Sequence, residues 1–191
     1  MKIRSSVVGR IALLLLWQLS SLSGKAADHV VKSLDPDRFQ GVSSVALRWS
    51  ESHGATSGVL VASLACSDCE AMLRGVPVAA RLVLVPMSAR DADCLRVLLS
   101  FVGAHPPEEQ EDALGEALHL AFCAIEANIS NPSGFRAELL DRWRRRHGDQ
   151  AAGFPDWAVA AAERRVETWR RMLRENGIAW TPTLLVPGEH R

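Results

Sequence analysis

The sequence predicts a single α/β domain, with helices on both faces of a sheet that contains parallel strands. An almost wholly apolar run at residues 59–65, VLVASLA, is typical of a strand buried on both faces. A short helical segment separates it from a second apolar run, RLVLVPM at 81–87, which makes a strand–helix–strand unit with parallel neighbours. A chain of 191 residues, 48% of them hydrophobic, is long enough for one sizeable core.

The N-terminal residues, 1–26, have the order of a secretory signal peptide. Basic residues up to Arg10 precede the uncharged stretch IALLLLWQLSSL, and the small residues Gly24 and Ala26 follow it. The apolar stretch is shorter than the roughly 20 residues that span a membrane easily. We therefore expect an exported protein of the bacterial periplasm, with an uncleaved membrane anchor as the alternative.

The charges balance over the whole chain. Lys and Arg together number 22, as do Asp and Glu, so the composition gives no reason to expect a nucleic-acid partner. Cleavage after Ala26 would remove four basic residues and leave 18 against 22 acidic ones. The run RRRH at 144–147 has acidic residues nearby and no interleaved aromatic residues, so we interpret it as a solvated helix face.

The remaining elements follow from periodicity and from breaks at Pro and Gly. We expect residues 27–42 to be a leader segment and the alternating residues 43–50, SSVALRWS, to be a half-buried strand that opens a domain at 43–191. Apolar spacing predicts helices at 66–74, 91–102, 108–127, 135–146 and 156–176, the last closed by Gly177. TLLV at 183–186, between Pro182 and Pro187, predicts a third short strand.

Two cysteines lie where the first buried run ends and a helix begins. Cys66 is at the helix N-terminus, where unpaired backbone N–H groups and the helix dipole favour a thiolate. Cys69 lies one turn further and can resolve a mixed disulfide. A purely structural bridge is the other interpretation, but so small a loop gains little entropy when it is closed. In an exported protein the spacing predicts a redox pair.

The motif CSDC at 66–69, together with TPT at 181–183 ahead of the last strand, resembles the thioredoxin-fold superfamily. The match extends over residues 43–191. A mostly helical insertion, at about 91–175 between the second core strand and a cis-proline loop, is similar to exported disulfide-exchange proteins. The ending ENGIAWTPTLLVPG is also similar to exported thioredoxin-like domains, including those fused to vitamin K epoxide reductase homologues.

The resemblance implies a thiol:disulfide oxidoreductase that works without a cofactor or a metal ion. Cys66 would be the nucleophile and Cys69 the resolving cysteine, and a cis Pro182 would keep its neighbours close to the sulfurs and hold back metal binding. Thr181 would pair its backbone with the substrate chain, and Trp180 would supply an apolar wall. The partners would be protein thiols or disulfides and a further redox partner; the direction of electron flow and the oligomeric state stay open.

The chain departs from this family at three places. Leu64-Ala65 precedes the motif where the family often has an aromatic residue. Asp68 and Glu70 oppose the helix dipole and should raise the pKa of the Cys66 thiol, which predicts a less oxidising couple than that of strong disulfide donors. The family adds a strand and a helix after the proline-loop strand, so we expect a short sheet, a sheet partly completed by residues 43–50, or a truncated sequence.

Two further cysteines and the metal-binding residue types leave alternatives open. Cys94 and Cys123, on the first two helices of the insertion, form a structural disulfide or remain buried thiols. No second Cys-x-x-Cys and no His-x-x-x-His occurs, so no metal site is predicted. The alternative functions are a copper-handling module and a non-catalytic binding module of the same fold. His105, in a break between helices, is expected at the surface.

Overall fold

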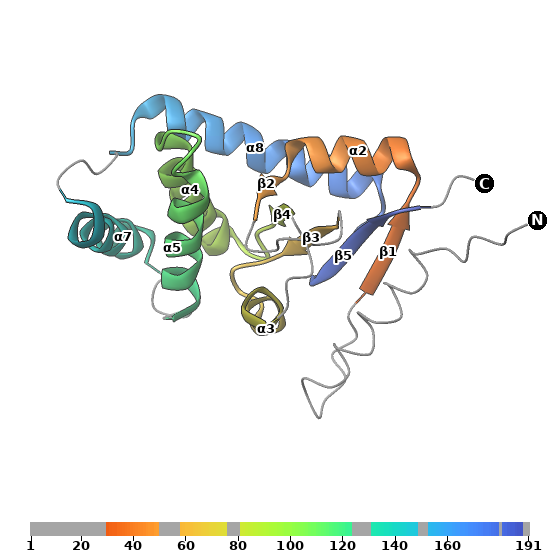
Figure 1. Cartoon of the computed structure of the whole chain (residues 1–191), viewed down its shortest axis with the longest axis horizontal. Helices are drawn as coiled ribbons and strands as arrows, with labels where there is room; N and C mark the ends of the chain where they lie inside the picture. Colours follow the sequence, from red (N-terminus) through yellow and green to blue (C-terminus); the bar gives the residue numbers. More distant parts are fainter. Residues whose placement is uncertain are drawn as a thin grey trace, which may run out of the picture.

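A five-stranded sheet with the order β1-β5-β3-β4-β2 lies at the centre of the protein (Figure 1). The computed structural model describes residues 30–49, 58–75, 81–123, 131–148, 153–179 and 181–188. Within these ranges it contains six helices, so the predicted mixed α/β class is confirmed. The predicted signal segment 1–26 lies outside them. No helix in the described ranges is both long enough and apolar enough to cross a membrane.

The central strands are those that the apolar runs predict. β3 (Val59–Ala62) and β4 (Arg81–Leu84) pair in parallel and are joined by α3 (Ser67–Gly75). All four residues of β3 are buried, as expected for a strand covered on both faces. β5 (Thr183–Pro187) pairs antiparallel with the other side of β3.

The two edges of the sheet differ from the prediction. Residues 43–50 do not form one strand, because Ser43–Val45 end helix α2 (Pro36–Val45) and only β2 (Leu47–Arg48) pairs with β4. The helix begins here because Asp35 accepts a hydrogen bond from the backbone N–H of Arg38 at 3.0 Å, with Pro36 in the first turn.

The segment expected as a leader supplies structure from residue 30 onward. β1 (Val30–Leu34) pairs in parallel with β5, and most of α2 follows within the same segment. The Lys32 ammonium donates to the carbonyl oxygens of Asn176 and Gly177 at 2.6 and 2.9 Å. A cation at a helix C-terminus stabilises the helix, so Lys32 links the edge strand β1 to the C-terminal end of α8 (Asp156–Glu175).

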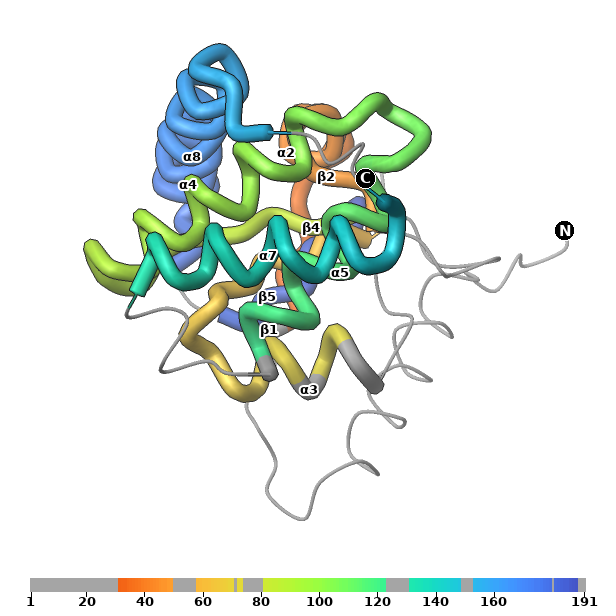
Figure 2. Tube along the Cα trace, turned by 90° about the vertical axis from the view of Figure 1, so that its left-hand side faces the viewer, coloured from red at the N-terminus to blue at the C-terminus, as the bar shows by residue number. Residues whose placement is uncertain are grey.

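Helices cover both faces of the sheet. α2 and α8 lie over one face and α3 lies under the other (Figure 1). The remaining helices are α4 (Ala89–Ala104), α5 (Gln110–Cys123) and α7 (Pro132–His147), and they gather on the side of the molecule away from β1 and β5 (Figure 1). Seen from that side, they lie in front of the sheet (Figure 2). Each predicted helix is therefore present, the second long one as far as Cys123, where the described residues stop. Gly177 has a φ of 60°, which is the left-handed backbone that the predicted C-cap requires.

One hydrophobic cluster joins the sheet to the helices. Its largest fully buried side chains include Trp143, Trp169 and Phe101, and the Trp169 indole N–H donates to the Val45 carbonyl at 3.0 Å. The expected surface position of His105 is wrong, because its ring packs against Phe101 and Trp143 with only 4% of the residue exposed. A break between helices is a surface position only when no neighbouring helix covers it, and α7 covers this one.

Candidate functional site

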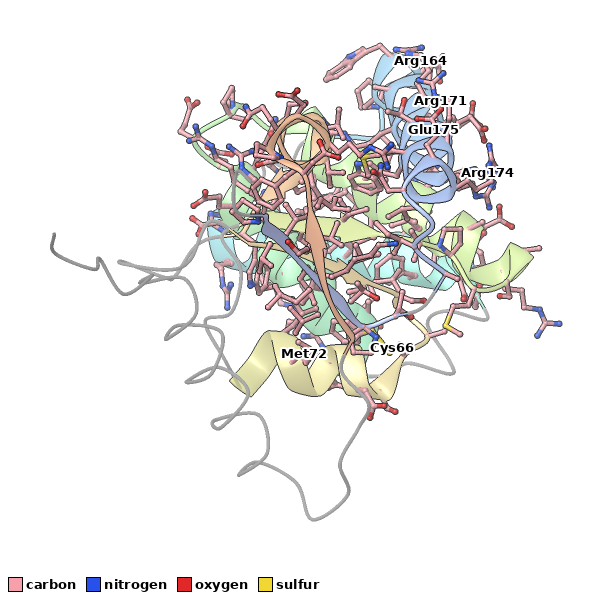
Figure 3. The ribbon with its side chains drawn as sticks, turned by 90° about the vertical axis from the view of Figure 1, so that its right-hand side faces the viewer. Cys66, Met72, Arg164, Arg171, Arg174 and Glu175 are labelled. Atoms are coloured by element: carbon pink, nitrogen blue, oxygen red, sulfur yellow. A yellow bond between two sulfur atoms is a disulfide. The ribbon has the colours of Figure 1, made fainter. Side chains whose placement is uncertain are left out.

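Cys66 and Cys69 form a disulfide at the N-terminus of α3, with their Cα atoms 5.2 Å apart. Figure 3 shows Cys66 at this end of the helix. Ser63, directly after β3, shapes the turn that leads to them. Its carbonyl accepts from the N–H of Cys66 and its hydroxyl accepts from the N–H of Ala65, both at 3.3 Å. The pair therefore lies at the carboxyl end of a buried central strand, at the start of a helix.

The two cysteines differ in their exposure to solvent. Cys66 is half-buried, whereas Cys69 has 0% of its surface exposed and its sulfur accepts the N–H of Ser63 at 3.4 Å. The backbone N–H of Cys69 points to the Cys66 sulfur at 3.2 Å. An incoming nucleophile can reach Cys66 and not Cys69, and the same N–H group is placed to hydrogen-bond a thiolate on Cys66.

Acidic side chains occupy the first turn of α3. Asp68 is exposed between the two cysteines, and Glu70 follows Cys69. A helix N-terminus attracts negative charge, so these carboxylates compete with a Cys66 thiolate for the same dipole. The backbone at this helix N-terminus therefore favours a thiolate on Cys66, whereas the neighbouring carboxylates disfavour it.

The segment before β5 lies beside the cysteines. The antiparallel register places Thr183 opposite Val61, so the residues that precede β5 run alongside those that follow β3. The Thr181–Pro182 peptide bond is cis, and Pro182 is buried. The structure thus brings four predicted site residues, Cys66, Cys69, Thr181 and Pro182, to one edge of the sheet. Trp180, the fifth, lies outside the described residues.

Met87 is part of this edge although no sequence pattern singled it out. Its side chain is 66% exposed, and its sulfur lies 4.0 Å from the Thr181 hydroxyl. The buried carboxylate of Asp91 accepts from the N–H groups of Met87 and Ser88 at 3.0 and 3.1 Å, which fixes the turn that presents the methionine. Its position at the end of the second apolar run could have indicated that it lies near the cysteines, because the carboxyl ends of parallel strands lie at the same edge of a sheet.

Cys94 is buried on α4, away from the redox pair in the sequence and on a different element. Burial raises the pKa of its thiol to about 11, and the nearby carboxylates of Asp91 and Asp93 add to the effect. Cys123 is the last residue of α5, but its side chain is not among those described. A disulfide between Cys94 and Cys123 therefore remains a prediction.

No group of three or more His, Cys, Asp or Glu side chains among the described residues is arranged to hold a metal ion. Comparison of the sequence with protein-family models gives no match, and comparisons with curated proteins and with solved structures give none either. The chemistry of the site therefore has to follow from its own residues.

Proposed function

We propose that this protein is a thiol–disulfide oxidoreductase of thioredoxin-like fold, in which Cys66 exchanges disulfides with protein partners. The observation that carries the proposal is the unequal exposure of two bonded cysteines at a helix N-terminus. Cys66 is half-buried and can be approached by a partner, while Cys69 is fully buried. A purely structural bridge needs no such difference in exposure, and a bond that closes so short a loop stabilises a protein less than one that closes a long loop.

The strand order supports the fold assignment. β3, α3 and β4 form a parallel strand–helix–strand unit, a connection that is right-handed as a general rule, and β5 returns antiparallel beside β3 with the proline loop at its start. Helices α4, α5, α7 and α8 lie between β4 and β5 in the chain, where the resemblance implies a helical insertion. The edge beside β5 is filled by β1, which runs parallel to it.

The reaction is a pair of sulfur displacements. A partner thiolate attacks the Cys66 sulfur, the Cys66–Cys69 bond breaks, and the electron pair leaves on Cys69. The second thiolate of the partner then attacks the partner sulfur of the mixed disulfide, and Cys66 leaves. The partner dithiol loses two electrons and two protons, which end on the two cysteines as thiols. The same steps in reverse reduce a partner disulfide.

The surrounding residues favour this sequence of steps. The N–H of Cys69 supports negative charge on Cys66 as it leaves, because a charged acceptor strengthens a hydrogen bond. Thr181 and Pro182 border the same edge, where an extended partner chain can add as a strand. A protein dithiol or disulfide in the opposite redox state has to regenerate the pair after each turnover.

The test is the equilibrium of the pair in graded glutathione buffers, read by thiol-labelling mass spectrometry. We expect a two-electron transition that Cys66→Ser abolishes, with Cys69→Ser accumulating a mixed disulfide on Cys66. Cys94→Ser is the matched control and should leave the transition unchanged. The midpoint potential of this transition would distinguish a disulfide donor from a disulfide reductant. A pair that stays oxidised throughout would contradict the proposal and favour the non-catalytic binding function.

Export is proposed from residues 1–26 alone. The protein recovered from the periplasm of a bacterial host should begin at residue 27, as N-terminal sequencing would show. Recovery of chains that begin at Met1 in the membrane fraction would support the uncleaved anchor instead.

A further inference from the structure

A groove of about 310 Å³ lies next to the proline loop, between the end of α8 and the sheet. Its lining includes Val61 and Val85 from the ends of the central strands, Thr181, and Arg170 and Arg174 from α8. The other lining residues are apolar: Leu173, Ile178 and Ala179. We call this set of residues the arginine groove.

The groove has apolar walls and a cationic rim. Val61 and Leu173 are buried, whereas Arg170 is half-buried and Arg174 is exposed. The two arginines are four residues apart on α8 and therefore lie on the same side of the helix. No carboxylate is among the described residues that line the groove. Such a surface fits a side chain with an apolar stem and a negative end.

Neither arginine of the groove is held by a strong ion pair among the described residues. Arg174 lies 3.7 Å from Glu167, and these two side chains are 69% and 67% exposed. An exposed ion pair of this kind contributes little, so Arg174 can turn to a new anion at small cost. Arg170 makes no ion pair with any part of the chain that the structure describes.

Thr181 connects the groove to the redox site. It lines the groove, contacts Met87, and belongs to the loop that runs beside the residues leading to Cys66. A partner chain that bonds to Cys66 and lies along Thr181 would continue over the groove. Because an extended chain advances about 3.3 Å per residue, three residues carry a partner side chain about 10 Å along the chain from its cysteine.

We propose that the arginine groove selects protein partners that carry Asp or Glu within about three residues of the reactive cysteine. The carboxylate pairs with Arg170 and Arg174, and its methylene stem contacts the apolar walls. This inference rests on the proposed disulfide exchange and adds the class of substrate. Rim charges act mainly on the association rate, so the selection should weaken as salt is added.

The test uses dithiol peptides that differ only at one position next to a cysteine, with Glu, Gln or Lys there. Two partly exposed ion pairs predict that the oxidised wild-type protein reacts about three- to tenfold faster with the Glu peptide than with the Gln peptide. The Lys peptide should be slowest. Raising the salt concentration should bring the Glu/Gln ratio toward one.

The matched variants separate the groove from the general charge of α8. Arg170→Gln/Arg174→Gln should abolish the Glu/Gln preference. Arg164→Gln/Arg171→Gln removes the same charge from exposed positions on the same helix and should keep it (Figure 3). The intrinsic reactivity of each peptide cancels when variant and wild-type ratios are compared. An equal loss in both double variants, or no preference in the wild type, would overturn the inference.

A binding measurement distinguishes failure of the inference from failure of the proposed function. Peptides with Ser in place of Cys are titrated by fluorescence anisotropy, with Glu or Gln at the test position. Exchange without charge preference overturns the groove assignment and leaves the oxidoreductase intact. Selective binding that depends on Arg170 and Arg174, without any exchange, overturns the oxidoreductase and retains the groove. The absence of both contradicts both proposals.

Discussion

Reduction of the Cys66–Cys69 disulfide should destabilise the protein by a small and calculable amount. The bond closes a loop of only four residues, counted from Cys66 to Cys69. The chain-entropy relation for a loop of that size gives about 6 cal/mol/K, or about 2 kcal/mol at room temperature. For a chain of this length the midpoint of thermal unfolding should fall by about 4–8 °C.

The assay is urea unfolding of the oxidised and reduced protein at pH 5. Acid favours the protonated form of a thiol, so a thiolate contributes least to the stability of the reduced protein under these conditions. The comparison therefore reports mainly on loop closure. A Cys66→Ser/Cys69→Ser variant serves as the control: any effect of reductant on its unfolding comes from the other cysteines and is subtracted.

The outcome also bears on the direction of electron flow. A folded state that favours the disulfide by about 2 kcal/mol makes the native couple about 40 mV more reducing than the same cysteines in the unfolded chain. A reduced form that is equally or more stable at pH 5 would refute the reasoning. It would mean that contacts in the folded protein favour the two thiols, as expected of a disulfide donor.

Three other predictions concern single side chains. Asp68→Ala should lower the pKa of the Cys66 thiol, measured by the pH dependence of its alkylation, because a nearby negative charge is removed; an unchanged pKa would exclude that effect. Trp169→Phe should lower the free energy of unfolding by about 1–3 kcal/mol, because the Val45 carbonyl loses its indole donor; a loss below about 0.5 kcal/mol would show that water replaces the donor. Because the pKa of Cys94 is raised in the folded state, the unfolded chain loses its proton first, so stability should fall between pH about 9 and about 11. Cys94→Ala should make that profile flatter, and identical profiles would mean that Cys94 carries no titrating thiol, as in a bridge to Cys123.

Local patterns in the sequence were sufficient to predict the strands and helices near the redox pair. Strand β3 is a short apolar run that any sheet would bury, and the helix after it begins directly after Cys66, with acidic residues in its first turn. The end of α8 could also be predicted from the sequence, because Gly177 can adopt the left-handed backbone conformation at low cost. Each of these features depends on residues within one or two turns of one another.

The edges of the sheet could not be predicted in this way. Strand β1 reads as a polar lead-in because its five residues include Lys32 and Ser33, and it becomes a strand only by pairing with β5, far away in the sequence. The role of Lys32 at the C-terminus of α8 could not be predicted either, because it also joins residues far apart in the sequence. His105 likewise follows a helix like any surface residue, and it is buried because Trp143 of the distant helix α7 packs against its ring in addition to Phe101.

The sequence by itself determined the redox pair, its place at a strand–helix junction and the proline that precedes the last strand, since these are local choices of residue type and spacing. Only the tertiary structure decided that Cys66 is accessible while Cys69 is buried, and that Met87, Thr181 and the arginine groove share one edge with them. The physical reason is that exposure and neighbourhood depend on how distant segments pack together. Packing reflects many weak contacts summed over the whole core, and no short stretch of sequence carries that sum.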